Sequence, residues 1–484
     1  MKISFPIRVY VIALILRLIP ILLTRGLGIG LDDMFQYDML ARSLASGNGF
    51  RWYAQEDLKL LEPYVDFDLS TAKNYDPELG VYTSFRAPLY PAFLAVVYFL
   101  NGLEFSRFFT ARLAQAILLG APLAPLTYLV SRYLLPGSEK AARASGWIAA
   151  CYPMLLVYPL GLGTENLFFV LLLSSFLFLL NSLNSHDSPN SPSILPHLLS
   201  GVLLALAALT RSVIFPFALL AFCVLFFHSR RSSFIFLAAF LAVVFPWVIR
   251  NSLLHHKLTG IETSMGYNLY LGYHPEGNGS FIFGPSLDLL TIMDDAERDK
   301  VGTQKALQFM KDQPERFLPL AVNRLGFFFG LEKRVLMYFY SNNIVGFIPK
   351  PALLTISAVL LLPFVFISTS AMFGFALLRR NPQTVLLTLL FASYILPHVF
   401  ILSEDRFHLA LIPFLAILAA HFWTSGIRGL VSRWNESPGG RLAVILAGFA
   451  VLFLLTNWGF ELFRDAGKIT ALLGADGNKT YFPY

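Results

Sequence analysis

Long apolar segments, separated by short polar or Gly- and Pro-rich stretches, recur along the whole chain. A helix needs roughly 17 to 25 residues to cross a hydrocarbon core of about 30 Å, and many of these segments approach or reach that length. Inside lipid, a helix also satisfies its own backbone hydrogen bonds. The pattern therefore predicts an all-α polytopic membrane protein with about eleven transmembrane helices. These are expected over residues 5–24, 108–134, 143–158, 165–183, 198–210, 213–227, 234–248, 352–378, 384–400, 409–422 and 442–456.

Two longer polar regions, residues 25–107 and 250–350, interrupt the series of predicted spans. The first contains an apolar stretch, residues 85–102, whose brevity and paired prolines favour a juxtamembrane helix over another span. In the second region, the residue spacing over 294–317 suits an amphipathic helix at the membrane interface. Both regions are therefore expected to contain helices that lie beside the membrane.

The composition agrees with a membrane protein, because 56% of the 484 residues are hydrophobic and 14% are charged, against about 25% charged residues in soluble domains. No large soluble domain is left over. We predict one transmembrane domain over residues 1–458 and a short external tail over residues 459–484. The two cysteines, Cys151 and Cys223, lie in apolar segments, so a disulfide framework is not indicated.

The short loops that collect Lys and Arg predict the orientation of the chain, because such loops face the cytoplasm. If residues 85–102 do not cross the membrane, all of the basic short loops fall on the side of the N-terminus. The N-terminus is then cytoplasmic, both long polar regions are external, and an odd number of spans places the C-terminus outside. The basic residues in these loops are Arg132, Lys140, Arg143, Arg230, Arg231, Arg379, Arg380, Arg428, Arg433 and Arg441.

Several charged residues fall at or near the predicted external ends of the helices. An acidic pair, Asp32 and Asp33, follows the first span, and it is the most unusual of these features. Charges at such places are costly unless they are paired, so each is a functional candidate. For two of the arginines, Arg112 and Arg250, an interfacial anchor is an equal alternative. The full set is Asp32, Asp33, Arg86, Arg112, Glu165, Arg250, Asn251 and Arg406.

This mixture of carboxylates and arginines suits the transfer of a sugar from a phosphate-linked donor. A carboxylate can accept the proton of an attacking hydroxyl, and guanidinium groups can stabilise the departing phosphate. The chain has no Gly-rich phosphate loop on a strand–helix unit, which favours a membrane-embedded donor over a sugar nucleotide. Two alternatives remain: a transporter or flippase of a lipid-linked sugar, and a catalytically silent lipid-binding scaffold. Arg211, alone in an apolar stretch, suits pairing inside the bundle at least as well as substrate contact.

A series of motifs, taken in order, resembles the family 39 branch of the GT-C glycosyltransferases. This branch is near the protein O-mannosyltransferases and the lipid A aminoarabinose transferase. The resemblance extends from the first span to about Phe414, and the order of the motifs carries it rather than any single one. The motifs are LDDMFQYDMLARSLASGNGF, FRAPLYPAFLAVVYFLNG, FTARLAQAILLG, LGLGTENLFF, ALTRSVIFPF, FPWVIRN, GYNLYLGYHPEGNG and EDRFHLALIPF.

The resemblance implies a GT-C fold, a polyprenyl-phosphate sugar donor and inversion at the anomeric carbon. It also implies a multi-pass enzyme of the bacterial cytoplasmic (inner) membrane whose active site faces the periplasm or exterior. The acceptor would be a hydroxyl of a glycan, a lipid or a protein. Membrane lipids are expected partners, and nucleic acid is not.

The resemblance also implies roles for particular residues. The family's acid stands eight positions before a small residue, which selects Asp33 as the general base by counting back from Ala41. The family usually has Asp followed by Glu, whereas Met34 follows here, so the division of roles between the two aspartates stays open. Glu165 resembles a second active-site acid. The expected donor phosphate-binding residues are Arg86, Arg406, Arg112 and Arg250, and the expected substrate-lining residues are Tyr37, Tyr90, Asn251, Tyr267, Asn268 and His408.

A divalent cation, Mg²⁺ or Mn²⁺, held by Asp32, Asp33 and Glu165 is a further hypothesis, because hard cations favour carboxylate ligands. Members near the aminoarabinose transferase look workable without a metal. Metal dependence therefore stays open at the level of the sequence.

Overall fold

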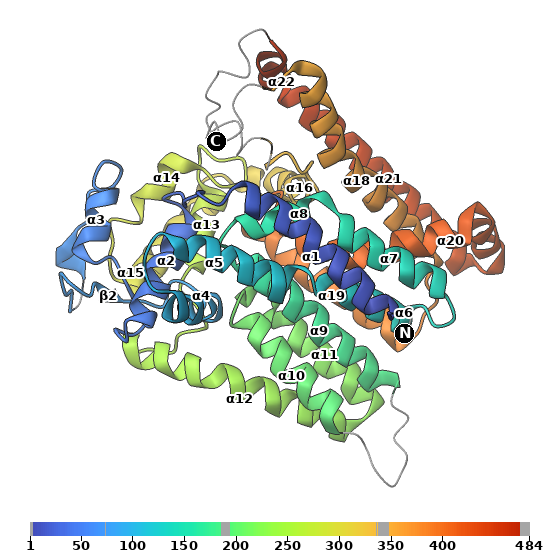
Figure 1. Cartoon of the computed structure of the whole chain (residues 1–484), viewed down its shortest axis with the longest axis horizontal. Helices are drawn as coiled ribbons and strands as arrows, with labels where there is room; N and C mark the ends of the chain where they lie inside the picture. Colours follow the sequence, from blue (N-terminus) through green and yellow to red (C-terminus); the bar gives the residue numbers. More distant parts are fainter. Residues whose placement is uncertain (1–2, 73, 185–193, 335, 337–347, 475–484) are drawn as a thin grey trace.

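The computed structural model describes residues 3–72, 74–184, 194–334, 336 and 348–474 (Figure 1). Within these residues, eight helices are long and apolar enough to cross a membrane. The protein is therefore an all-α, multi-pass membrane protein, as the apolar pattern predicts. Two of the eight spans are composite: α5 and α6 form one, and a short 3₁₀ helix precedes α20 in the other. The span in α9 is counted only to Leu183. The helices concerned are α1 (Phe5–Leu23), α5 (Ser106–Ala114) with α6 (Leu123–Leu134), α9 (Thr164–Asn184), α12 (Arg230–His255), α18 (Lys350–Leu377), α19 (Pro382–Phe400), α20 (Ile412–Glu436) and α21 (Pro438–Arg464).

The other three predicted spans correspond to shorter helices, α7 (Glu139–Cys151), α10 (Ile194–Ala208) and α11 (Phe215–His228). α7 ends early because Tyr152 precedes a proline and takes an extended conformation, with φ −65° and ψ 119°. The same proline then begins the short helix α8 (Pro153–Val157). The backbone at Arg211, between α10 and α11, is also extended.

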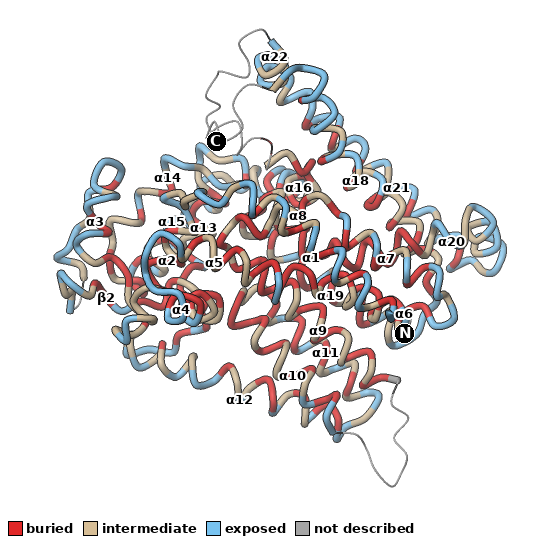
Figure 2. The backbone as a smooth tube through the Cα atoms, viewed as in Figure 1, coloured by how far each residue is buried: buried red, intermediate tan, exposed pale blue. Residues whose placement is uncertain are grey.

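The core of the bundle lies around α20. All residues from 412 to 420 are buried, and this stretch packs against α7, α18 and α6. Across the interface with α9, the rings of Phe176 and Phe414 meet edge to face with centroids 5.1 Å apart. Figure 2 shows buried residues concentrated in the middle of the bundle and exposed residues along α21. Exposed large hydrophobic residues on α1, α12, α18 and α21 form surfaces suited to lipid.

The two long polar regions form a lobe at one end of the bundle, on the left in Figure 1. This lobe comprises residues 31–72, 74–101 and 256–316. In its first part, α4 has 13 residues, which confirms that the apolar stretch 85–102 forms a short helix. In its second part, α15 confirms the helix predicted over 294–317. The elements of the lobe are α2 (Asp33–Ala45), β1 (Arg51–Trp52), α3 (Gln55–Leu61), β2 (Val81–Tyr82), α4 (Leu89–Asn101), α13 (Met265–Tyr273), α14 (Phe283–Asp288) and α15 (Asp295–Asp312).

The two parts of the lobe are held together through the segment before α4. Asp295, the first residue of α15, accepts hydrogen bonds from Thr83 Oγ1 at 2.6 Å and from the backbone N–H of Ser84 at 2.7 Å. Strands β1 and β2 pair antiparallel in the same region. The chain leading to Arg86 is therefore fixed on both sides.

Two further helices lie outside the spans and the lobe. α16 (Phe317–Phe328) leads from the lobe back to the bundle, and α22 (Ala466–Leu473) follows α21. α21 continues beyond residue 458 to Arg464, so part of the predicted polar tail is helical. Residues 475–484 of that tail lie outside the described residues.

Candidate active site

The structure separates the acidic pair into two different environments. Asp32 is the N-cap of α2, and its Oδ1 accepts a hydrogen bond from the backbone N–H of Met34 at 2.8 Å. This is the usual role of Asp at a helix start. Asp33 is the first residue of α2, and it instead contacts two arginine side chains. The two aspartates thus differ in their contacts, and the division of roles between them stays a prediction.

Asp33 lies between Arg86 and Arg406. Nη2 of Arg86 donates to Oδ1 of Asp33, and Nη2 of Arg406 donates to Oδ2 at 3.1 Å. Nε of Arg86 donates to Gln36 Oε1 at 2.8 Å, which fixes the guanidinium beside α2. The side chain of Asp33 keeps 34% of its surface exposed. A small polar group therefore has access to this carboxylate.

Arg406 joins Asp33 to two further acids. Its Nη1 lies 3.8 Å from Glu165 Oε1, and its Nε lies 3.2 Å from Glu404 Oε2. Glu165 is also paired with Arg211, with Nη1 of Arg211 at 2.7 Å from Oε1. Glu404 in turn is paired with Arg334. We call Asp33, Arg86, Glu165, Arg211, Glu404 and Arg406 the acid–arginine cluster.

Separate elements carry the members of the cluster to one place. Glu165 lies in the first turn of α9, where the helix dipole favours a carboxylate. Arg211 stands at the extended junction between α10 and η4 (Ser212–Ile214). Arg406 immediately precedes the short helix η6 (Phe407–Leu411). No two of these three residues belong to the same helix, so the cluster exists only in the folded chain.

The arginines dominate the electrostatics around Asp33. Burial raises the pKa of Asp33, but Arg86 and Arg406 outweigh burial and hold it well below its ordinary value. Burial lowers the pKa of Arg406, while Glu404, Glu165 and Asp33 raise it well above the ordinary value. Asp33 is therefore a stable carboxylate in this state of the protein.

The arginines keep donors beyond those that the carboxylates use. In the described part of the chain, Nη1 of Arg86 and Nη2 of Arg211 have no recorded acceptor. The contact from Nη1 of Arg406 to Glu165, at 3.8 Å, is too long for a hydrogen bond. Guanidinium donors in surplus at one place suit an anion with several oxygen atoms, such as a phosphate.

Two arginines expected to bind phosphate lie elsewhere. Arg112 is 1% exposed and donates to the backbone carbonyl groups of Leu27, Gly28 and Leu160. Its role in this arrangement is to hold the end of α1 against the chain before α9. Arg250 donates to the carbonyl of Thr83 at 2.6 Å and faces the ring of Trp247. The structure brings neither residue into contact with Asp33.

Three residues expected to line the substrate site are buried and bonded within the protein. Tyr90 is fully buried and donates to Gln115 Oε1 at 2.8 Å. Asn251 is also fully buried, and its Nδ2 donates to the carbonyls of Gly260 and Ile261. His408 contacts the Phe328 carbonyl and Glu332, and its ring stacks on Phe364. The polar atoms of these side chains thus bond within the protein in this structure, and a lining role for them stays a prediction.

The other three expected lining residues lie closer to the cluster or remain accessible. Tyr37 packs edge to face on Tyr90, and the guanidinium of Arg86 lies 5.4 Å from its ring centroid. Tyr267 is half-buried and donates to the carbonyl of Ser286 at 3.0 Å. Asn268 is half-buried on α13. A lining role for these three stays a prediction.

The proposed cation site does not fit the arrangement of its residues. The described residues contain no group of three His, Cys, Asp or Glu side chains that could hold a metal ion. Arg406 contacts both Asp33 and Glu165, so a guanidinium stands between these carboxylates. Asp32 is turned toward the backbone of its own helix. The three carboxylates expected to bind Mg²⁺ or Mn²⁺ therefore do not converge on one point.

Sequence reasoning missed part of the cluster. Glu404 lies within the EDRFH motif, and its position two residues before Arg406 was the available signal. Gln36 and Arg334 carried no such signal. For Arg211 the sequence allows either an ion pair inside the bundle or a substrate contact, and the structure shows an ion pair with Glu165 at the site.

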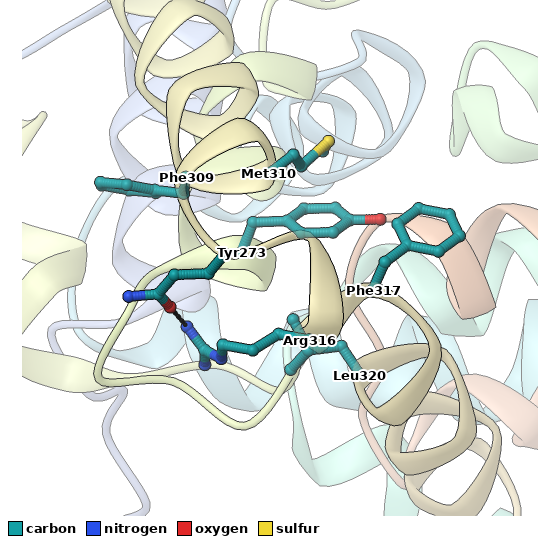
Figure 3. A pocket seen from close by; sticks show the side chains of 7 residues that line it. Tyr273, Phe309, Met310, Arg316, Phe317 and Leu320 are labelled. Atoms are coloured by element: carbon teal, nitrogen blue, oxygen red, sulfur yellow. Dashed lines mark hydrogen bonds between the residues drawn. The ribbon is translucent and has the colours of Figure 1, made fainter.

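A small pocket lies apart from this cluster, where α15 meets α16 (Figure 3). Arg316 crosses its edge and donates from Nη1 to Gln313 Oε1 at 2.7 Å. The pocket has room for about one water molecule. It contains no member of the acid–arginine cluster. Its lining residues are Tyr273, Phe309, Met310, Gln313, Arg316, Phe317 and Leu320.

The comparisons with known proteins find similarity in structure alone. No family model and no curated protein sequence matches the chain. An oligosaccharyltransferase of Archaeoglobus fulgidus, solved with a tethered acceptor peptide, aligns with TM-score 0.49 and 16% identity over 100% of this chain and 60% of its own. AglB of the same organism, solved with an inhibitory peptide and a dolichol-phosphate, aligns with TM-score 0.49 and 14% identity. The alignment covers 99% of this chain and 60% of AglB.

A third solved structure is ArnT from Cupriavidus metallidurans bound to undecaprenyl phosphate. It aligns with TM-score 0.39 and 13% identity over 88% of this chain and 79% of its own. All three alignments have TM-scores below 0.5 and identities of 16% or less. The chain spans about 60% of the length of the archaeal oligosaccharyltransferases. At these scores, the function has to be argued from the acid–arginine cluster itself.

Proposed function

We propose that this protein is an integral membrane glycosyltransferase that moves a sugar from a polyprenyl-phosphate donor to an acceptor hydroxyl, with inversion. The observation that carries the proposal is the carboxylate of Asp33 held between Arg86 and Arg406. This arrangement supplies a base and an anion-binding group within one contact distance of each other. Transfer takes place on the outer face of the bacterial cytoplasmic membrane, with the N-terminus of the chain inside.

The arginines act on the leaving group. A polyprenyl-phosphate sugar is a phosphodiester with one negative charge, and the departing polyprenyl phosphate gains a second. Guanidinium groups of Arg86 and Arg406 stabilise that added charge, and their surplus donors can bind phosphate oxygens. Because the interaction strengthens as the bond breaks, it favours the transition state over the bound donor.

Asp33 acts on the acceptor. Its carboxylate takes the proton of the hydroxyl as that oxygen forms a bond to the anomeric carbon. On the opposite face, the electron pair of the breaking carbon–oxygen bond goes to the phosphate, which gives inversion. As Arg86 and Arg406 share their donors with the developing phosphate charge, they stabilise the Asp33 carboxylate less and make it a stronger base. The proton of Asp33 then passes to solvent.

The remaining members of the cluster position Arg406. Glu165 and Glu404 contact different nitrogen atoms of its guanidinium, and they are held in turn by Arg211 and Arg334. His408 anchors the following turn to the carbonyl of Phe328 at 2.7 Å. A guanidinium fixed in this way meets the phosphate without a large loss of side-chain freedom.

The transporter alternative needs ionisable groups along a path that crosses the membrane. The acid–arginine cluster instead gathers beside the lobe at one end of the bundle. That placement favours transfer over translocation. Free polyprenyl phosphate appears as a product only in the transfer reaction.

The experiment is to express the protein and its Asp33→Asn variant in membranes and to supply polyprenyl-phosphate sugars. We expect the wild type to release free carrier phosphate and Asp33→Asn to be slower by about a hundredfold or more. Asp32→Asn is the matched control, because it removes the neighbouring carboxylate and leaves both arginine contacts in place. If Asp33→Asn were nearly as active as the wild type, Asp33 would not be the base. No release from any donor would contradict the proposed function.

A further inference from the structure

Glu262 is an acid near the cluster that no part of the mechanism uses. It lies in the chain between α12 and α13, where its two neighbours are fixed by hydrogen bonds. The carbonyl of Ile261 accepts from Trp247 Nε1 at 2.9 Å and from Asn251 Nδ2 at 3.0 Å. The N–H of Thr263 donates to the carbonyl of Ser84 at 3.0 Å. The backbone therefore holds Glu262 in one place.

The side chain of Glu262 lacks the arginine partner that the acids of the cluster have. Asp33, Glu165 and Glu404 each pair with an arginine. Glu262 is half-buried and accepts a hydrogen bond from Ser212 Oγ. Across the residues that the structure describes, no Lys or Arg lies within ion-pair distance of it. Its remaining acceptor positions are free for a ligand.

Two observations place Glu262 at the edge of the candidate active site. Its partner Ser212 directly follows Arg211, which pairs with Glu165. Glu262 and Asp33 also act on the same guanidinium: burial lowers the pKa of Arg86, and Asp33, Tyr37 and Glu262 raise it, with a net increase. The charges of the proposed base and of this unpaired acid thus both act on Arg86.

An unpaired carboxylate beside an anion site repels phosphate, so its chemistry suits another part of the donor. The sugar is joined directly to the phosphate, and its hydroxyl groups lie within a few bonds of the phosphate oxygens. A carboxylate accepts hydrogen bonds from two neighbouring hydroxyl groups at once. A site built to accept such bonds discriminates strongly against sugars that lack them, because its own polar atoms are then left unpaired.

We propose that Glu262, oriented by Ser212, accepts hydrogen bonds from hydroxyl groups of the donor sugar and selects which sugar is transferred. This inference rests on the proposed function. It assigns the recognition of the carrier phosphate to the arginines and the recognition of the sugar ring to Glu262. Changing Glu262 therefore alters the choice of sugar and leaves the carrier contact intact.

The test compares the wild type with Glu262→Gln on polyprenyl-phosphate glucose, mannose and galactose, which differ in the configuration of single hydroxyl groups. We expect the ratio of apparent kcat/KM between the best donor and its epimer to fall by about tenfold or more in Glu262→Gln. The affinity for polyprenyl phosphate without a sugar should stay within about twofold. Glu276→Gln, an exposed acid in the same lobe, is the matched control and should leave the ratio unchanged.

A second variant guards against a folding defect. Ser212→Ala keeps Glu262 and removes only its recorded hydrogen bond, so it should lower the same ratio to a smaller extent. An unchanged ratio in Glu262→Gln would overturn the inference while the proposed function stands. Equal losses of affinity for donor and for carrier would also overturn it, because Glu262 would then act through Arg86. If the wild type releases carrier phosphate from no donor, the proposed function itself fails.

Discussion

Arg406 donates a hydrogen bond from Nη2 to Oδ2 of Asp33 over 3.1 Å, although 373 positions separate the two residues in the chain. The other oxygen of the same carboxylate is bound by Arg86. A carboxylate held by two guanidinium groups is a weak base, because both stabilise its ionised form. The same two arginines are the proposed phosphate ligands. Binding of the phosphate and activation of the base are therefore one event.

This competition predicts that Asp33→Asn binds polyprenyl phosphate more tightly than the wild type. Removing the carboxylate frees both guanidinium groups for the phosphate, and we expect about tenfold higher affinity, which corresponds to roughly 1.4 kcal/mol. The measurement is a calorimetric titration of the purified protein with polyprenyl phosphate.

Asp32→Asn is the control for this titration. It removes a neighbouring negative charge that is bonded to the Met34 N–H and makes no arginine contact in the described structure. It should change the affinity much less. Equal increases in affinity in the two variants would show that only the local negative charge matters. That result would contradict the proposal that the arginines exchange Asp33 for the phosphate. Weaker binding by Asp33→Asn would contradict it as well.

The lowered pKa of Asp33 predicts a difference between two pH profiles. In the free enzyme, Arg86 and Arg406 hold this pKa below its ordinary value of about 3.9, so Asp33 stays ionised as the pH falls to about 4. The profile of kcat/KM reports the free enzyme, and that of kcat reports the donor complex. Because the phosphate shares the arginines in that complex, the pKa of Asp33 rises there.

We therefore expect kcat to decrease at a higher pH than kcat/KM as the solution is acidified. The measurement is the rate of carrier phosphate release over a range of pH and donor concentration. If kcat/KM instead decreased at a higher pH than kcat, the proposed release of Asp33 by the arginines would be contradicted.

Arg112 and Arg406 should respond differently to replacement by lysine. Arg112→Lys leaves some of the three carbonyl acceptors of Arg112 without a donor, and loss of the bond to the buried Leu160 carbonyl alone should cost about 1–3 kcal/mol. It should lower the thermal unfolding midpoint and leave the carrier affinity of the folded protein unchanged. Arg406→Lys should weaken carrier binding by about tenfold, because lysine lacks the planar fork of donors.

Thermal unfolding in detergent and titration with polyprenyl phosphate, performed on both variants, separate these two roles. Arg428→Lys, an exposed site on α20, is the control for both measurements. Loss of carrier affinity in folded Arg112→Lys would restore it as a phosphate ligand. Unchanged affinity in Arg406→Lys would remove the central contact of the proposed mechanism.

The sequence predicted the membrane class and most helices because the hydrophobic pattern reports directly which segments can enter lipid. It was less accurate at α7, where the apolar segment continues past Pro153 but the helix cannot. The motifs also led to Asp33, Arg86, Glu165 and Arg406, and the structure brings these four together. Their chemical roles stay predictions until they are tested.

By itself, the sequence determined that the chain is a bundle of apolar helices with charged residues at their ends, since apolar length and local residue order need no partner. Only the tertiary structure decided which charges meet. It turned Asp32 toward its own helix, Arg112 toward backbone carbonyls and Arg211 toward Glu165, and it left Glu262 without a cation among the described residues. The physical reason is that an ion pair depends on which helix faces pack together, and hydropathy does not specify that.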